Sequence, residues 1–570
     1  MVKVEDITKR LTDLKRMRLP WEPMWKDITQ FVMPRRSFWD LDATPGQAPT
    51  KIYDGTAIAA VQLLADGLQG NSVNQYLKWF HMTMEDKKQQ DAEGVADWLE
   101  SVEEILYAEF ARSNFYESMS EFFLDASSLG TAVSFVEDDV GDKRVLFNTR
   151  HLKECYLAES KTGAVDTVFR DYVMTNRAAY QAWGKDLCQQ RIDKTKSDPY
   201  GKAHIVHACY PRADRIEGKI DGQSKAWASV YMDKDHQVLI DEGGYDAFPY
   251  LVWRWRKNSD EIYGRSPAAD AINDIIRINQ VGKTMLQAAQ NSVEPPLNVP
   301  AAMRGTERIV PRGYNYYTNP NEMIYPINLA QNYPIGKDQQ DDIKEQIRDV
   351  FRTRIFLLAE QIESGKYTAT EIIERKSEGA VIWGATIGRL YSECLLPAIG
   401  RMYTICERNG LLPPAPPTVG GRVHIEFEGP IAQAMKRYHQ SQGVVAGTQF
   451  LAGMAPLDPS GTFMDNTDLD ELARIGMDSS GMPQRVIREL SRVQAMRKAR
   501  AAAIEKQRQE ALALEQQKML AANVGGLNEP LKPDSILAGV AKAAAQPKKK
   551  NIQIERDGDG RMTGASVTEG

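Results

Sequence analysis

Two long helical segments separated by an insert rich in proline and tyrosine constrain this chain more than any other feature. The first helix is expected to begin after Ser266, a hydroxyl residue suited to the N-cap, with Pro267 at its first position. Apolar residues then recur at helical spacing as far as Glu294, where Pro295 and Pro296 cannot continue the helix. At 1.5 Å per residue such a helix is a rod of roughly 42 Å.

The insert, residues 295–335, contains seven prolines and five tyrosines, which predicts an irregular, extended excursion. A second helix is expected over residues 336–356, with acidic residues in its first turn and one apolar stripe. The sequence Thr-Ala-Thr-Glu at 368–371 is a capping box, so a third long helix should begin there, be kinked near Pro397 and end at Gly410.

The apolar stripes of the first two helices need a surface to pack against. A hairpin of two helices cannot bury both flanks alone, so identical copies standing side by side would cover them. The stripe residues expected at contacts between copies are Ile272, Ile276, Ile343, Ile347 and Phe351. The simpler alternative is a pair of core helices in a large globular enzyme, joined by a surface loop, and periodicity alone favours that alternative.

Length and charge limit the classes of protein to consider. A chain of 570 residues can form several domains, and its net charge of −6 argues against a protein that grips nucleic-acid phosphates broadly. The five cysteines include no CxxC pair, which is typical of reduced thiols in the cytosol. The sequence shows neither a signal peptide nor an apolar run long enough to span a membrane.

The periodicity predicts an α+β fold that is mainly α-helical. Residues before 130 are mostly helical, whereas residues 131–256 alternate with a period of two. This alternation predicts antiparallel strands at 132–136, 165–169, 205–210, 226–232 and 250–255. A further strand is expected at 424–427 and a long helix near 483–522, whereas residues after 525 have a disordered composition.

No motif predicts an enzyme. Gly282-Lys283-Thr284 matches the end of a phosphate-binding loop but lies inside an unbroken helix. His204 and His207 would face opposite sides of a strand, a poor geometry for one metal ion. Residues 557–560 imitate a calcium loop but lack its later acidic ligands. We therefore expect no catalytic residue, cofactor or metal.

Several stretches, taken in order, resemble the portal, or head-to-tail connector, proteins of short-tailed double-stranded-DNA phages. Together they cover roughly residues 1–500. They are residues 25–35 (WKDITQFVMPR), 52–57 (IYDGTA), 64–70 (LADGLQG), 78–80 (KWF), 115–131, 248–250 (FPY), 254–255 (RW), 263–267 (YGRSP) and 368–371 (TATE).

The resemblance implies a portal fold that assembles into a ring, in this family usually of twelve subunits, around a central DNA channel. It implies the following divisions: a wing at 1–258, a first stem helix at 259–294, a clip at 295–335, a second stem helix at 336–356, a tunnel loop at 357–367, the wing's long helix and strand at 368–430, a crown at 431–482, a C-terminal barrel helix at 483–524 and a disordered tail at 525–570.

The resemblance also implies sites and partners. The tunnel loop would approach DNA through Glu360, Glu363 and Lys366, although Lys366 fits an ordinary solvated loop lysine equally well. The clip would dock the terminase large subunit and then tail adaptor or tail tube proteins, through Arg304, Arg308, Arg312, Tyr314, Tyr316 and Tyr317. Scaffold, major capsid and internal core proteins are further expected partners, with no membrane.

On this resemblance the protein is assembled in the host cytoplasm and sits at one vertex of the capsid. Two alternatives from other classes remain at this point. One is a multidomain cytosolic phage enzyme acting on nucleic acid, and the other is a tail or capsid adaptor.

Overall fold

The computed structural model describes residues 3–34, 52–86, 94–139, 144–213, 221–305, 333–353, 383–417, 422–430, 490–524, 550–556 and 562–569, with isolated positions between these ranges, chiefly at 307–327. The chain divides into two compact units, Met1–Met482 and Pro483–Gly570, and each is described by itself.

The first unit combines helices and antiparallel strands, which confirms the predicted α+β class. Its helices are α1 (Val4–Arg18), α2 (Glu22–Phe31), α3 (Thr56–Ser72), α5 (Val95–Arg112), α6 (Phe115–Leu129), α7 (Asn176–Trp183), α8 (Gln189–Ser197), α9 (Pro267–Val293), α10 (Tyr333–Val350), α13 (Gly384–Leu390) and α14 (Leu396–Arg408). Its strands are β1 (Phe80–Met84), β2 (Thr131–Asp139), β3 (Arg144–Arg150), β4 (Cys155–Glu159), β5 (Val165–Thr175), β6 (Lys202–Pro211), β7 (Trp227–Asp233), β8 (Val238–Tyr245), β9 (Tyr250–Arg254), β10 (Leu297–Asn298), β11 (Tyr325–Pro326) and β12 (Val423–Phe427).

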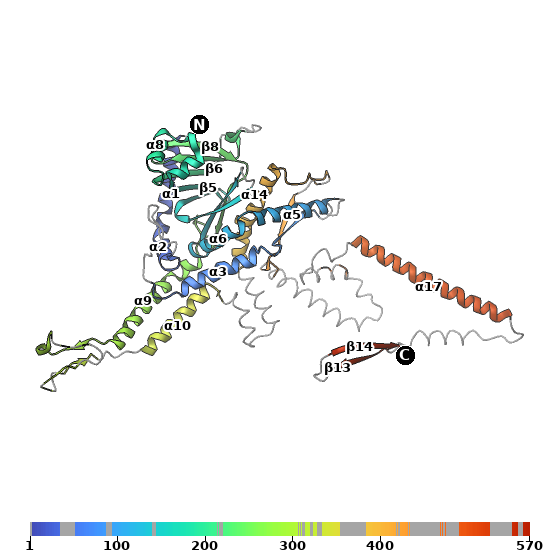
Figure 1. The fold of residues 1–570 in the computed structure, drawn as a ribbon. Helices are drawn as coiled ribbons and strands as arrows, with labels where there is room; N and C mark the ends of the chain where they lie inside the picture. Colours follow the sequence, from blue (N-terminus) through green and yellow to red (C-terminus); the bar gives the residue numbers. More distant parts are fainter. Residues whose placement is uncertain are drawn as a thin grey trace. The chain divides into compact units, whose positions relative to one another are not determined.

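The strands between 131 and 254 form two antiparallel sheets. One has five strands in the order β4-β5-β6-β7-β8, and the other has three in the order β3-β2-β9. Figure 1 shows the larger sheet at the end of the unit farthest from the tip of the α9–α10 pair. The predicted strands near 132–136, 165–169, 205–210, 226–232 and 250–255 are all present, whereas β3, β4 and β8 were not predicted.

Helices cover both faces of the five-stranded sheet. On one face α1 buries Ile7, Leu11 and Leu14 against strand residues that include Phe169 and Val206. On the other face α7 and α8 pack against a second set of strand residues: Tyr172, Ala203, Ile205 and Ile240. The alternation of the two sets along β6 follows from the period-two geometry of a strand.

The largest core joins the α-helices to the three-stranded sheet and to the roots of α9 and α10. It includes large, fully buried aromatic residues such as Trp25, Trp79, Phe122 and Trp253. Figure 1 shows α9 and α10 leaving this core side by side, and both also contact α3. The pair of helices is therefore rooted in the core at one end only.

A π-helical segment, Tyr391–Leu395, separates α13 from α14, and Pro397 lies in the first turn of α14. Because proline has no N–H to donate, the helical ladder is interrupted near this point. The sequence predicted a kink at Pro397, and the structure has a π segment immediately before it. The predicted start at 368–371 lies outside the described residues.

The second unit contains one long helix, α17 (Leu490–Val524), and a hairpin of β13 (Lys550–Arg556) with β14 (Met562–Glu569). The helix agrees with the one predicted near 483–522. These two strands lie within residues 525–570, whose composition predicts a disordered tail. Most of the predicted crown, 431–482, lies outside the described residues.

Candidate functional site

The candidate site is the pair of helices α9 and α10 with the segment between them, hereafter the α9–α10 hairpin. Ser266 caps α9 as predicted, because its Oγ accepts a hydrogen bond from the Ala269 N–H at 3.0 Å. The same Oγ donates to the Ser128 carbonyl at 2.5 Å, which ties the start of α9 to the end of α6. The helix ends at Val293, one residue before the predicted Glu294.

Two of the sequence motifs meet where α6 ends and α9 begins. Gly130 has a φ of +83°, and a Cβ added there would lie 2.3 Å from the Gly264 carbonyl oxygen. A Cβ on Gly264 would lie 2.3 Å from the Gly130 oxygen, and the Gly264 N–H donates to the Thr131 hydroxyl at 2.9 Å. The backbones approach this closely only because neither residue has a side chain.

A third motif packs against the middle of α9. The Tyr53 N–H donates to Asn279 Oδ1 at 2.7 Å, and a Cβ on Gly282 would lie 3.3 Å from Tyr53. On the neighbouring helix, Lys344 lies 3.8 Å from Asp54. Gly282 therefore allows residues 52–54 to pack closely against α9. This packing explains the glycine in Gly282-Lys283-Thr284 without a phosphate-binding loop.

A buried cation braces the root of the hairpin. Arg254, only 1% exposed, donates to Glu393 of the π segment at 2.6 Å and also pairs with Glu159 of β4. Lys257 joins the same Glu159 at 2.8 Å. These pairs connect β9, β4 and the π segment, and Arg254 also donates to the carbonyl of Ile262, five residues before α9, at 3.4 Å. They could not be predicted from the sequence because the partners are far apart in the chain.

The prediction that Ile343, Ile347 and Phe351 await a neighbouring copy is wrong. They are 2%, 0% and 0% exposed in a single chain, because α9 and α3 of the same chain already cover that stripe of α10. The second helix also begins earlier and ends earlier than predicted, at Tyr333 and Val350. Pro334 is compatible with that start, since the first turn of a helix needs no N–H donors there.

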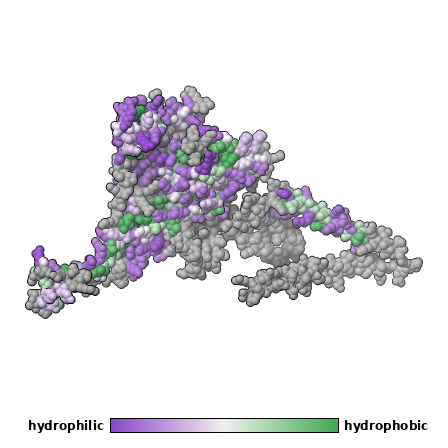
Figure 2. Space-filling model, in the orientation of Figure 1, coloured by the Kyte–Doolittle hydropathy of each residue, from purple (hydrophilic) through white to green (hydrophobic). Residues whose placement is uncertain are grey.

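The apolar residues that do remain uncovered lie elsewhere on the hairpin. Ile272 is half-buried against the core, whereas Ile276 is 37% exposed. Other large apolar side chains are exposed on these helices: Leu286, Val293 and Val350. Figure 2 shows apolar patches along the part of the surface that α9 and α10 occupy. We call Ile276, Leu286, Val293 and Val350 the exposed flank of the hairpin.

Among its described residues, the segment between the helices is paired through a short ladder. Leu297 pairs with Pro326 and Asn298 with Tyr325, in the two-residue strands β10 and β11. Beyond it the predicted docking residues Arg304, Tyr314, Tyr316 and Tyr317 are all exposed, the three tyrosines by 78%, 87% and 53%. Arg308 and Arg312, and the predicted channel residues Glu360, Glu363 and Lys366, lie outside the described residues.

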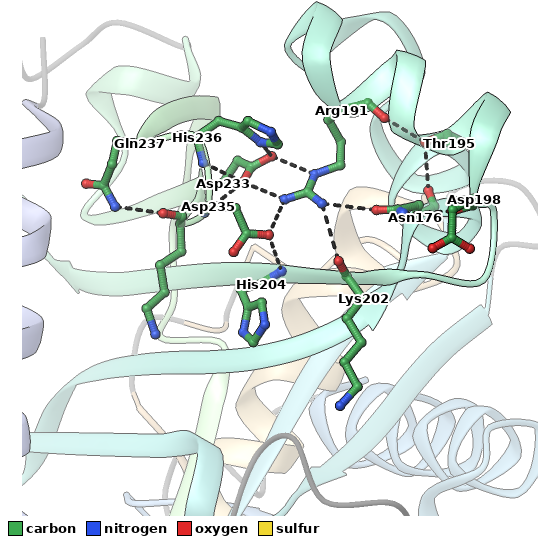
Figure 3. A network of polar contacts seen from close by, with 11 residues as sticks. Asn176, Arg191, Thr195, Asp198, Lys202, His204, Asp233, Asp235, His236 and Gln237 are labelled. Carbon is green, nitrogen blue, oxygen red and sulfur yellow. Dashed lines mark hydrogen bonds and ion pairs between the residues drawn. The ribbon is translucent and has the colours of Figure 1, made fainter.

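A cluster on the five-stranded sheet resembles a metal site. Cys188, Asp233 and His236 place potential ligand atoms within 4.8 Å of one another. However, Arg191, which is fully buried, donates to both oxygens of Asp233 at 2.8 Å and to Asp235 at 2.5 Å (Figure 3).

Burial is the largest single influence and works to raise the pKa of Asp233, but the hydrogen bonds from Arg191 and His236 together with the charge of Arg191 lower the pKa overall. The carboxylate already has a cation, so this network fastens α8 to β7, and it does not present an open coordination site. His207, which the sequence shows to be poorly placed for a metal ion, is buried and hydrogen-bonded to Tyr250 and Ser229. Among the described residues no helix is long and apolar enough to cross a membrane.

Comparison with known proteins identifies the class. Residues 4–487 match the family described as "Bacteriophage head to tail connecting protein", so the chain belongs to that family. It is therefore a structural connector, a phage portal-type protein, and the prediction that it is not an enzyme is confirmed.

Two relatives are similar over nearly their whole length. The "Portal protein" of Salmonella phage epsilon15 is 28% identical over 565 residues, covering 95% of this chain and 99% of the relative. The "Probable portal protein" of Bordetella phage BPP-1 is 28% identical over 510 residues, covering 87% and 90%. A chain from the "Neck of empty GTA particle computed with C6 symmetry" matches with 10% identity and a TM-score of 0.32, over 74% of this chain and 90% of that one.

Proposed function

We propose that copies of this chain form a closed ring, of twelve subunits as is usual for portals, at one vertex of the phage capsid. Double-stranded DNA enters through the central channel during packaging by the terminase motor and leaves through it during ejection. The ring is assembled in the host cytoplasm and remains in the virion. The observation that carries the proposal is the exposed flank of the α9–α10 hairpin in a member of the head-to-tail connecting family.

The surface chemistry supports an assembly in which this hairpin is the stem. Ile276, Leu286, Val293 and Val350 are large apolar residues on two helices that leave the core together. Burial of apolar surface is worth about 25 cal/mol per Å², so flanks of this kind favour contact with another surface. In a ring every contact is heterologous, so one flank of a hairpin meets a different surface of the next copy.

The second unit supports the same proposal independently. The described side chains of α17 are nearly all exposed, and they include Met496, Ile504, Leu512 and Leu514. A helix of 35 residues that buries so little within its own unit gains most of its stability from neighbours. We assign residues 483–524 to a barrel of helices from successive copies.

The segment between α9 and α10 is proposed as the clip. Its exposed Arg304, Tyr314, Tyr316 and Tyr317 are of the residue types enriched where proteins bind one another. The terminase large subunit would dock there first, and tail adaptor or tail tube proteins afterwards. Arg308 and Arg312 belong to the same proposal, and scaffold, major capsid and internal core proteins would contact other parts of the ring.

The loop at 357–367 is proposed as the part nearest DNA, with Glu360, Glu363 and Lys366 as its polar residues. A net charge of −6 per subunit suits a channel through which DNA must slide, because each phosphate contact adds affinity. Few basic contacts would therefore be favoured over many.

Native mass spectrometry of the purified protein tests the proposal. The expected result is a closed assembly of a fixed number of copies, with twelve as the expected number. A chain that stays monomeric at concentrations and ionic strengths spanning those of phage assembly would contradict it.

A further inference from the structure

A pocket beside α14 has no role in the functions described above. Its volume is about 300 Å³, it is partly open to solvent, and it lies between α14 and the segments flanking β7 and β8. Its charged and aromatic lining consists of Lys225, Tyr245, Asp246, Arg401, Glu407 and Arg408.

Arg401 is the unusual member of this lining. It is only 4% exposed, and its guanidinium stands over the Tyr245 ring at 5.1 Å from the centroid. Within the described part of the chain it makes no hydrogen bond or ion pair, and its Nε is buried without a partner. Burial is the main influence on the pKa of Arg401 and lowers it, but an arginine stays protonated. Asp138 and Asp246 attract this charge without bonding to it, so the buried guanidinium has no directly bonded carboxylate among the described residues.

Other buried arginines of this chain show how unusual that is. Arg191 bonds to Asp233 and Asp235, and Arg254 bonds to Glu159 and Glu393. Each has its counter-charges supplied by the same chain. A buried guanidinium without a bonded carboxylate is costly, and the guanidinium of Arg401 lines an open pocket.

Among the described residues, no carboxylate at the pocket forms an ion pair with Arg401. Arg408 is paired with Asp138, and Lys225 is paired with Asp246. Glu407 is exposed at the rim and forms no ion pair with Arg401 among the described residues. A planar carboxylate matches both the charge and the fork of donors that a guanidinium offers.

We propose that this pocket receives an aspartate or glutamate side chain from the neighbouring copy in the ring. The inference depends on the ring of the proposed function and adds a specific contact to it. Cyclic contacts are heterologous, so a pocket at the contact between copies would meet a different surface of the next copy. The ion pair would form only on assembly, which makes ring formation depend on Arg401.

Paired substitutions of two buried arginines test this dependence. Arg401→Met keeps the volume and removes the charge, so the monomer should melt at the same temperature or higher, while the concentration for half-assembly rises tenfold or more. Arg191→Met, the matched control, should lower the melting temperature of the monomer, because it strands two carboxylates. If Arg401→Met destabilised the monomer as Arg191→Met does, or left assembly unchanged, the inference would be overturned.

A chemical cross-link tests where the carboxylate comes from. In Arg401→Lys, an amine stands at the site, and a water-soluble carbodiimide joins it to a carboxylate in contact by an amide bond with loss of water. Rings built from mixed nitrogen-15-labelled and unlabelled chains should yield mixed-isotope peptide pairs through position 401. Cross-links confined to Glu407 or Asp246 of the same chain would overturn the proposal.

Acetate serves as the probe for a free anion. If acetate raised the melting temperature of the wild-type monomer and no cross-link joined two copies, the pocket would be a site for a free carboxylate, contrary to the proposal. If the wild type forms rings and Arg401→Met assembles equally well, this inference alone is refuted. Absence of wild-type rings would instead refute the proposed function.

Discussion

Gly130 and Gly264 show how single residues set the geometry at the base of the hairpin. Their backbones lie so close together that a methyl group on either residue would clash. The added Cβ would lie 2.3 Å from the carbonyl oxygen of the other residue. Both atoms in conflict belong to rigid backbone, so a side-chain rotation cannot relieve the clash. These residues were noted in the sequence as parts of motifs, but their contact was not predictable, because 134 positions separate them.

We expect Gly264→Ala to lower the free energy of unfolding of the first unit by about 2–3 kcal/mol, the cost of forcing a backbone apart. Denaturant unfolding followed by tryptophan fluorescence measures it. Gly388→Ala is the matched control, because Gly388 lies within α13 with no atom within 4 Å of the added Cβ. It should be neutral or stabilise by up to about 1 kcal/mol. Equal effects of the two changes would contradict this account of the contact.

A histidine–glutamate pair predicts a dependence on pH. Glu103, 1% exposed, accepts from Lys78 at 2.7 Å and lies 2.7 Å from His81 Nδ1. The hydrogen bond to Glu103 raises the pKa of His81 above 6.5. Burial tends to raise the pKa of Glu103, but the bonds from His81 and Lys78 prevail and lower it below 4.5.

The direction of the pH dependence follows from whether the folded or the unfolded state binds the proton more tightly. The folded state holds the His81 proton more tightly, so this stabilisation is complete below pH 6.5 and is lost as the pH rises through the folded value. The Glu103 contribution is present above 4.5 and is lost as the pH falls. His81→Gln should therefore cost more stability at pH 6 than at pH 8.5, in urea unfolding at both. His424→Gln, an exposed change on the paired strand, is the matched substitution for comparison at both pH values.

At the scale of elements, the helices were more predictable than their surroundings. The cap at Ser266 and the prolines after Glu294 are local signals, and α9 begins and ends within one residue of them. The burial of Ile343, Ile347 and Phe351 was not predictable, because periodicity shows that a stripe must be covered without showing by what. Strands β3 and β4 were missed because charged and polar residues interrupt their short apolar patterns.

Because Ile347 is buried within one chain and Ile276 is exposed, substitutions at the two positions should affect different properties of the protein. Ile347→Asp would place a carboxylate in a fully buried site, so it should destabilise the single chain by more than about 3 kcal/mol, whatever its effect on the ring. Ile276→Asp lies on the exposed flank and should change monomer stability by less than about 0.5 kcal/mol.

Ile276→Asp should nevertheless weaken ring assembly at least tenfold, because it charges an apolar contact. Thermal unfolding and sedimentation velocity on both variants separate the two effects. If Ile276→Asp assembled normally, the exposed flank would not be the contact between copies. If Ile347→Asp folded as stably as the wild type, the assignment of its burial would be wrong.

At the scale of the whole molecule, the class of protein was predictable from the order of short motifs, and the family match over residues 4–487 confirms it. The structure explains why those motifs belong together, since 52–54, 129–131 and 263–267 all meet around the start and middle of α9. The Arg254 and Arg191 networks and the pocket at Arg401 were beyond prediction, because each joins residues from distant segments.

The claim on which the account depends is that chains with an uncovered flank close into a ring around a hole. Electron microscopy of the purified, full-length protein, with averaging of end-on views, tests it most directly. The predicted image is a ring of identical subunits with an axial opening wide enough for duplex DNA. Single, separate particles with no axial opening, at concentrations where the chain is fully folded, would contradict it.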